Sequence, residues 1–170
     1  MNKRYIFPEC FLDQELLLLL GVTRKQINKA TDIADVMKKF GQEVYRDSKA
    51  VGFVDLNETN SQPSRLQRFQ DVREQDDLIW KQGLESKHIL IVVRPRLEDW
   101  IYSAAHSVGI NPAQPPYYLP KSAKDLHDSI TAKRSVRDNK KVMNFLKDVV
   151  DKNPLPIQTL RSWITEIQSL

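Results

Sequence analysis

Carboxylate side chains close or follow each of the three most apolar segments of the chain, where buried strands would end. The pairs of segment and acid are residues 4–8 with Glu9, residues 50–56 with Asp55, and residues 87–93 with Glu98. Carboxylates that converge at one sheet edge repel each other unless a cation neutralises them. Mg²⁺, with Mn²⁺ as the alternative, prefers oxygen ligands of this kind. The pattern therefore indicates a metal site.

Each acid also has an ordinary structural explanation. Glu9 and Glu98 lie near predicted helix starts, where negative charge is favoured, and the same reason is sufficient for Asp99. Asp55 ends a predicted strand, where Asp often begins a turn. The coincidence at three strand ends, rather than any single acid, favours one shared site.

The segments that would position these acids alternate between strand and helix patterns. Residues 50–56 and 87–93 are almost continuously apolar, which is typical of strands covered on both faces. In α/β sheets, ligands bind at the carboxyl ends of the strands. Helices are predicted over residues 11–20, 31–40 (capped by Thr31), 96–108, 122–130 (capped by Ser122), 135–150 and 157–167, with short helical segments over residues 23–30 and 64–74 and an edge strand over residues 77–82.

This order of elements predicts an α/β fold: a small, mostly parallel sheet flanked by helices, with a helical extension at the C-terminal end. Residues 1–110 would form the α/β core, and residues 111–170 would form a proline-rich loop and a helical extension packed on that core. The length of 170 residues suits a single domain overall. Trp80, Trp100 and Trp163 are expected to be core residues.

Composition argues against several classes of protein. No apolar run approaches the roughly 18 residues of a membrane span, and the N-terminal segment lacks the apolar core of a signal peptide. We therefore expect a cytoplasmic protein with no membrane partner. The single cysteine, Cys10, excludes an intrachain disulfide and a cysteine-based zinc site, and is expected to be a small buried residue. His88, His106 and His127 show no ligand spacing and are expected to lie outside any site.

The net charge of +4 permits a nucleic-acid partner without requiring one. Residues 121–170 carry all of it, with ten Lys or Arg against six Asp or Glu, which suits either a phosphodiester ligand or a solvated helical surface. Arg94 and Arg96 follow the third strand and are candidates for nucleic-acid binding, with surface solubility as the alternative. Tyr117 and Tyr118 are candidates for stacking on bases, or simply for pinning their loop.

Three stretches of the sequence resemble the Toprim (topoisomerase–primase) family over roughly residues 4 to 108. "YIFPECFLDQELLLLLG" looks like the first strand, its Glu and the following helix, and "AVGFVDLNET" is similar to a later strand that ends in Asp-x-Asp. "ILIVVRPRLEDWI" resembles a Leu-Glu-x-Trp segment of small bacterial and phage Toprim-like proteins, several of them linked to defence or mobile elements. The resemblance implies that Glu9 is a general acid/base or metal-binding residue, Asp55 a metal ligand and Glu98 an accessory acid.

Two positions depart from the family pattern. Cys10 stands where a small glycine-type residue is expected, and Asn57 replaces the second Asp of Asp-x-Asp. An amide oxygen still ligates Mg²⁺, so Asn57 stays in the predicted ligand set, with Glu58 or Asp99 able to compensate for the lost charge. The resemblance implies a Mg²⁺-dependent nuclease or related phosphotransfer enzyme, or else a degenerate, non-catalytic module that binds a protein or nucleic acid. The choice between DNA and RNA and the oligomeric state stay open.

Overall fold

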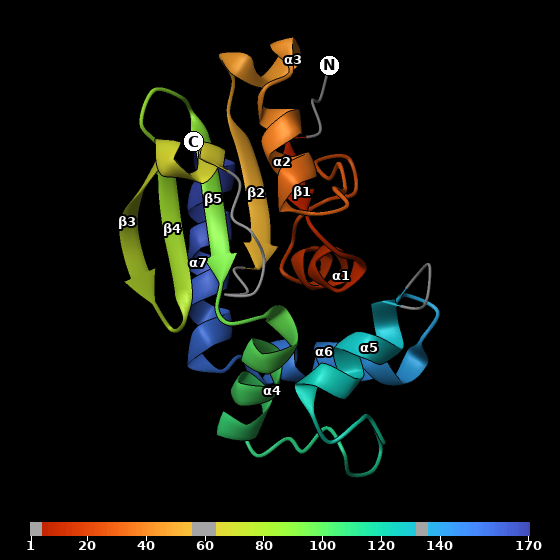
Figure 1. The fold of residues 1–170 in the computed structure, drawn as a ribbon. Helices are drawn as coiled ribbons and strands as arrows, with labels where there is room; N and C mark the ends of the chain where they lie inside the picture. The colour runs from red at the N-terminus through yellow and green to blue at the C-terminus, as the bar shows by residue number, and fades with distance from the viewer. Residues whose placement is uncertain (1–4, 56–63, 132–135) are drawn as a thin grey trace.

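The computed structural model describes residues 5–55, 64–131 and 136–170, and Figure 1 shows helices packed around one central sheet. The sheet has five strands in the order β1-β2-β5-β4-β3. Their bounds are β1 (Ile6–Pro8), β2 (Ala50–Asp55), β3 (Phe69–Gln75), β4 (Leu78–Gly83) and β5 (His88–Val93). Strands β1, β2 and β5 run parallel, whereas β4 runs antiparallel to both β5 and β3. The predicted α/β class is confirmed, with a mixed sheet in place of a mostly parallel one.

The helices lie on both faces of the sheet. Their bounds are α1 (Phe11–Leu19), α2 (Ile33–Phe40), α3 (Glu43–Arg46), the 3₁₀ helix η1 (Ser64–Arg68), α4 (Leu97–Ser107), α5 (Ala123–Thr131), α6 (Lys140–Lys152) and α7 (Leu155–Ser169). Among the described residues, no helix is long and apolar enough to cross a membrane.

Strand β2 separates two hydrophobic cores, as its continuous apolar pattern predicts. Val51 and Phe53 face the core shared with α1, α4, α5, α6 and α7, whereas Ala50 and Val54 face the core under α2 and α3. Gly52 allows α2 to approach the strand closely, since a Cβ there would lie 2.7 Å from Val36 Cγ1. The close approach brings the start of α2 to the carboxyl end of β1.

The antiparallel half of the sheet differs from its prediction. Residues 69–75, expected within a polar helix, form the edge strand β3, and β4 is an internal strand instead of the edge. Five of the seven residues of β3 are charged or polar and none of the seven is buried, which hides the period of two. Asp76 and Asp77 adopt positive φ angles of 53° and 58°, which closes the hairpin between β3 and β4.

Smaller corrections concern helix starts and the segment after α1. Residues 23–30, expected as a short helix, form a turn and a single bridge between Ile6 and Ile27. Asp32, rather than Thr31, caps α2, because its carboxylate accepts the Asp35 N–H at 2.7 Å. Ser122 caps α5 as predicted, accepting the Asp125 N–H at 3.1 Å.

The C-terminal helices share the larger core with the sheet. Trp80 of β4 packs edge-on against Trp163 of α7, with ring centroids 5.8 Å apart. In the proline-rich loop, Tyr117 is buried and donates its hydroxyl to Asp148 of α6 at 2.6 Å, which matches the loop-pinning alternative. Tyr118 is 61% exposed, with Lys141 over its ring.

Candidate functional site

Glu9 joins the ends of β1 and β2 to the start of α2. Its Oε2 accepts the backbone N–H of Asp55 at 3.0 Å, and the backbone N–H of Ile33, the first residue of α2, lies close enough to lower the pKa of the carboxyl. Burial is the main cause that raises the pKa of the Glu9 carboxyl above its ordinary value. Glu9 is therefore held in place by backbone groups at a point where three elements meet.

Asp55 occupies the same position at the end of β2. The backbone N–H of Leu97, the first residue of α4, lies close enough to lower the pKa of its carboxyl, and its Oδ1 is buried with no hydrogen-bond partner among the described residues. Burial, followed by the charges of Asp13 and Glu98, raises the pKa of Asp55 to about 9. The strand end thus holds a carboxyl group that retains its proton at neutral pH unless a cation replaces it.

Asp13 is a member of this group that the sequence explains only as a helix-start residue. It forms a reciprocal cap with Cys10: Asp13 Oδ2 accepts the Cys10 N–H at 2.7 Å, and Cys10 Sγ accepts the Asp13 N–H at 3.4 Å. The other oxygen, Oδ1, is buried without a partner. Asp13 is only 1% exposed, and burial raises its pKa to about 8. The sequence predicts only a helix-capping role for Asp13, whereas the structure shows a buried carboxyl of which one oxygen accepts a hydrogen bond and the other does not.

Glu98 enters from the first turn of α4 and is 2% exposed. Its Oε1 lies 2.9 Å from Nδ1 of His127 on α5, and its Oε2 has no partner. His127, expected to lie outside any site, thus contacts one of the candidate acids. The two residues are 29 positions apart and no short motif links them, so only the packing of α5 on α4 reveals the contact.

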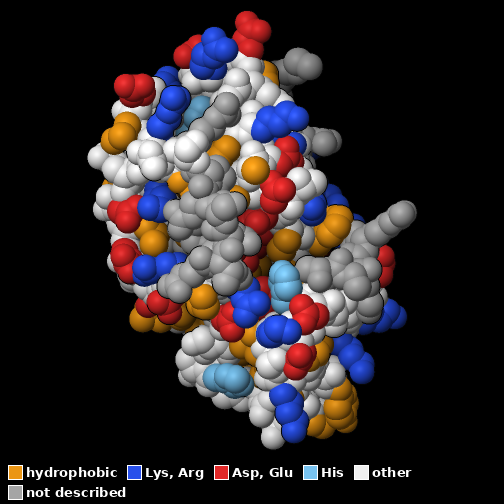
Figure 2. Space-filling model, viewed as in Figure 1, with side chains coloured by type: hydrophobic (Ala, Val, Ile, Leu, Met, Phe, Trp, Pro, Cys, Tyr) orange, Lys and Arg blue, Asp and Glu red, His pale blue; other side chains and the backbone are white. Residues whose placement is uncertain are grey.

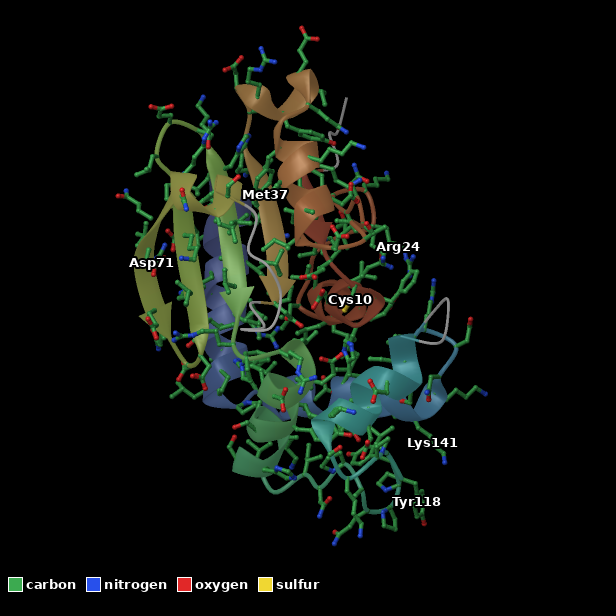
Figure 3. The ribbon with its side chains drawn as sticks, in the orientation of Figure 1. Cys10, Arg24, Met37, Asp71, Tyr118 and Lys141 are labelled. Carbon is green, nitrogen blue, oxygen red and sulfur yellow. The ribbon has the colours of Figure 1, made fainter. Side chains whose placement is uncertain are left out.

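The four acids form one group, here called the carboxylate cluster: Glu9, Asp13, Asp55 and Glu98. The charges of Asp13, Glu98 and Glu9 all raise the pKa of Asp55, and Glu98 also raises the pKa of Glu9 and Asp13, which places all four within electrostatic reach. Glu9, Asp55 and Glu98 are brought together because β1, β2 and β5 are parallel and end at the same edge. Figure 3 labels Cys10, which lies at the start of α1 beside the cluster.

The oxygen atoms of the cluster are of the type that binds a hard divalent cation. The described side chains, however, are not arranged as a group that could hold one. Asp13, Asp55 and Glu98 each offer a buried oxygen without a partner. Within residues 5–55, 64–131 and 136–170, no three Asp, Glu, His or Cys side chains form a group that could hold a metal ion. Asn57, the remaining predicted ligand, and Glu58 lie outside the described residues.

The predicted nucleic-acid-binding residues are engaged in ion pairs. Arg94 pairs with Glu74 of β3, and Arg96 Nε lies 3.0 Å from Asp99 Oδ2, which accounts for Asp99. Figure 2 shows basic and acidic side chains interspersed over the visible face, with no large patch of a single sign. Lys124 also pairs with Asp128 at 3.1 Å.

The remaining candidates have structural roles. His88 is buried, with its ring stacked on Phe40 at 4.5 Å and its Nε2 2.9 Å from the Tyr45 carbonyl oxygen. Trp80, Trp100 and Trp163 are core residues as predicted.

Comparison of this chain with protein-family models, with curated proteins and with solved structures gives no match.

Proposed function

We propose that the carboxylate cluster binds Mg²⁺ or Mn²⁺ and that the protein is a Toprim-like enzyme that cleaves or transfers phosphodiester bonds in nucleic acid. The observation that carries this proposal is the set of three buried carboxylate oxygens without partners, on Asp13, Asp55 and Glu98. Leaving such atoms unsatisfied destabilises a fold, and a bound cation would offset that cost. A helix cap accounts for Asp13 Oδ2 and the contact with His127 accounts for Glu98 Oε1, but neither accounts for the buried oxygens.

The proposed roles follow from the position of each acid. Asp55 and Glu98 would hold the cation with Asn57, and Glu9 would act as a ligand or as a general acid/base. The pKa of Glu9 is raised above its ordinary value, chiefly by burial, and a raised carboxyl pKa is a common feature of general acid/base residues. A cation bound here would polarise the phosphoryl oxygen and ease deprotonation of water. The backbone N–H of Asp55 donates to Glu9 Oε2 and would orient that carboxylate.

Arg94 and Arg96 would bind the nucleic-acid backbone by exchanging their partners. Both belong to partly exposed ion pairs, with Glu74 and Asp99. Such pairs contribute only about 0–1 kcal/mol to the stability of the fold, so an Arg side chain loses little free energy when a phosphate replaces its carboxylate partner. Release of counterions from the nucleic acid would favour the exchange at low salt.

The second candidate is a non-catalytic Toprim-like module that binds a nucleic acid or a protein partner. It is favoured by one observation: among the described residues, no group of three side chains is arranged to hold a metal ion. The replacement of an acid by Asn57 points in the same direction. The two candidates differ in whether a cation binds and whether bonds are broken.

The test begins with thermal melting of the parent protein over a series of Mg²⁺ and Mn²⁺ concentrations. We expect Tm to rise with the cation, since ligand binding to the folded state alone stabilises it. Glu9→Gln and Asp55→Asn keep the shapes of the side chains but remove their charges, and should abolish the rise. Glu74→Gln, in an exposed ion pair of β3, is the matched control and should retain it. If neither Mg²⁺ nor Mn²⁺ changes the Tm of the parent protein, the metal proposal is overturned.

Cleavage is measured separately on end-labelled single-stranded DNA, double-stranded DNA and RNA. Mn²⁺-dependent cleavage that Glu9→Gln and Asp55→Asn both remove supports the enzyme. If the protein binds the nucleic acid but does not cleave it at any cation concentration, the result supports the non-catalytic module instead.

A further inference from the structure

The contact between His127 and Glu98 is the point where the C-terminal helices reach the carboxylate cluster. His127 Nδ1 lies 2.9 Å from Glu98 Oε1, within the range of a charge-assisted or neutral hydrogen bond. The His127 side chain is 39% exposed, whereas that of Glu98 is 3% exposed. His127 therefore stands between a buried acid and the protein surface.

Helix α5 holds His127 in a fixed position. Leu126, the preceding residue, is 1% exposed and belongs to the larger hydrophobic core together with Ala123 and Ile130. The segment entering the helix is tied to α4, because the Tyr102 hydroxyl donates to the Pro120 carbonyl at 2.8 Å. Packing of this kind limits the rotation of the helix and so the place of the imidazole.

The contact divides the two oxygens of Glu98 into different roles. Oε1 meets the imidazole, and Oε2 is buried without a partner. Glu98 also lies within electrostatic reach of Glu9, Asp13 and Asp55. A carboxylate fixed at one oxygen presents the other in a defined direction, which is how outer hydrogen bonds orient metal ligands in proteins.

We propose that His127 is a positioning residue of the carboxylate cluster: it fixes Glu98 so that Oε2 is presented to a divalent cation. Helix α5 is then part of the site rather than only a support for the fold. This inference rests on the proposed cation binding.

The experiment measures Mn²⁺ affinity of the full chain by calorimetric titration. Loss of an outer-shell partner typically weakens metal binding by about 10- to 100-fold, and we expect this loss in His127→Ala. His127→Asn keeps a nitrogen near the position of Nδ1 and should bind within about threefold of the parent protein. The matched control is His106→Ala, because His106 is an exposed residue of α4 whose ring packs edge-on against Tyr102.

A double-mutant cycle separates positioning from a general effect on folding. If His127 acts through Glu98, His127→Ala should weaken Mn²⁺ binding in the parent background but add nothing in the Glu98→Gln background. Thermal melting without metal verifies that each variant is folded. If His127→Ala is not folded, His127→Asn takes its place in the cycle.

The outcomes distinguish this inference from the proposal it rests on. No Mn²⁺ binding by the parent protein would overturn both. Parent-like binding by His127→Ala, or an undiminished effect of His127→Ala in the Glu98→Gln background, would overturn the role of His127 alone. A loss in His127→Ala that His127→Asn restores and that Glu98→Gln masks would support it.

Discussion

Acidic side chains are held in opposite ways in the two halves of the sheet. In the antiparallel half, two exposed acids of β3 pair with basic side chains, Asp71 with Lys81 and Glu74 with Arg94, and Arg73 of β3 pairs with Glu166 of helix α7. At the ends of the parallel strands, the carboxylate cluster is buried, and among the described residues no Lys or Arg forms a salt bridge with it. Residues of one chemical type therefore differ in burial and in ion pairing according to where the topology places them.

The contrast extends to protonation. The hydrogen bonds from Arg73 lower the pKa of Glu166, so that acid supports folding above its ordinary pKa and loses this effect as pH falls. Burial raises the pKa of Asp13 to about 8 and of Asp55 to about 9, which has the opposite sign. The ionised form of Glu166 therefore favours folding, whereas the protonated forms of Asp13 and Asp55 favour folding.

The largest expected effect is therefore a pH dependence of stability in the presence of a chelator. In the unfolded chain Asp13 and Asp55 lose their protons near pH 4, whereas the folded chain keeps them to about 8 and about 9. The folded state binds more protons in this window, so the free energy of unfolding should fall as pH rises from about 4 to about 9. At about 1.4 kcal/mol per pKa unit, the fall amounts to several kcal/mol.

Denaturant unfolding over this pH range measures the effect, with Asp13→Asn/Asp55→Asn as the control that should flatten the profile. Added Mg²⁺ should reduce the loss at the alkaline end. A free energy of unfolding that rises through this window in the parent protein would contradict the burial of these two acids.

The next effect compares a single acid from each half. Asp55→Asn should stabilise the protein at pH about 8 without metal, by about 2 kcal/mol or more, because each unit of raised pKa corresponds to about 1.4 kcal/mol. Glu74→Gln breaks only an exposed ion pair and should destabilise it by less than about 1 kcal/mol. Denaturant melts of both variants measure the difference, and equal effects of the same sign would remove the distinction between the two halves.

Local patterns predicted the half of the fold that carries the cluster. Strands β2 and β5 are continuous apolar runs, and their parallel pairing brings Asp55 to the edge where Glu9 and Glu98 also arrive. Predicting that the three acids lie at one edge of the sheet thus required only knowing which segments are strands and that they run parallel. The ligand set, by contrast, stays a prediction, because Asn57 lies outside the described residues.

The remaining features depend on contacts between distant residues. His127 meets Glu98, and Arg94 meets Glu74 at a separation of 20 positions, and neither pair has a signature within one segment. Strand β3 was missed because Val72 is 51% exposed and its neighbours are polar, so an edge strand looks like a surface helix. Asp13 was missed because capping explains it locally, while its burial arises from packing.

A smaller effect separates two ion pairs within the antiparallel half. The Arg73 guanidinium lies 4.3 Å from the Trp80 ring centroid and also makes two hydrogen bonds to Glu166, at 2.8 and 2.6 Å. Arg73→Gln should lower the free energy of unfolding by about 1 kcal/mol more than Arg94→Gln, because it removes a cation–π contact as well as an exposed ion pair. Thermal or denaturant melts test this, and an equal loss in both variants would assign no role to the aromatic contact.

The smallest effect on stability should come from Arg94→Gln itself, at less than about 1 kcal/mol. An ion pair that contributes so little can exchange its carboxylate for a phosphate, so the same variant should weaken nucleic-acid binding similarly for all sequences. The slope of log affinity against log salt should fall by about one, measured by fluorescence anisotropy over a salt series. Arg73→Gln is the control, because that guanidinium is fixed by Trp80 and Glu166. An Arg94→Gln protein with the parent slope would show that Arg94 only joins β3 to the end of β5, and the basic contact to the phosphate would have to come from another residue.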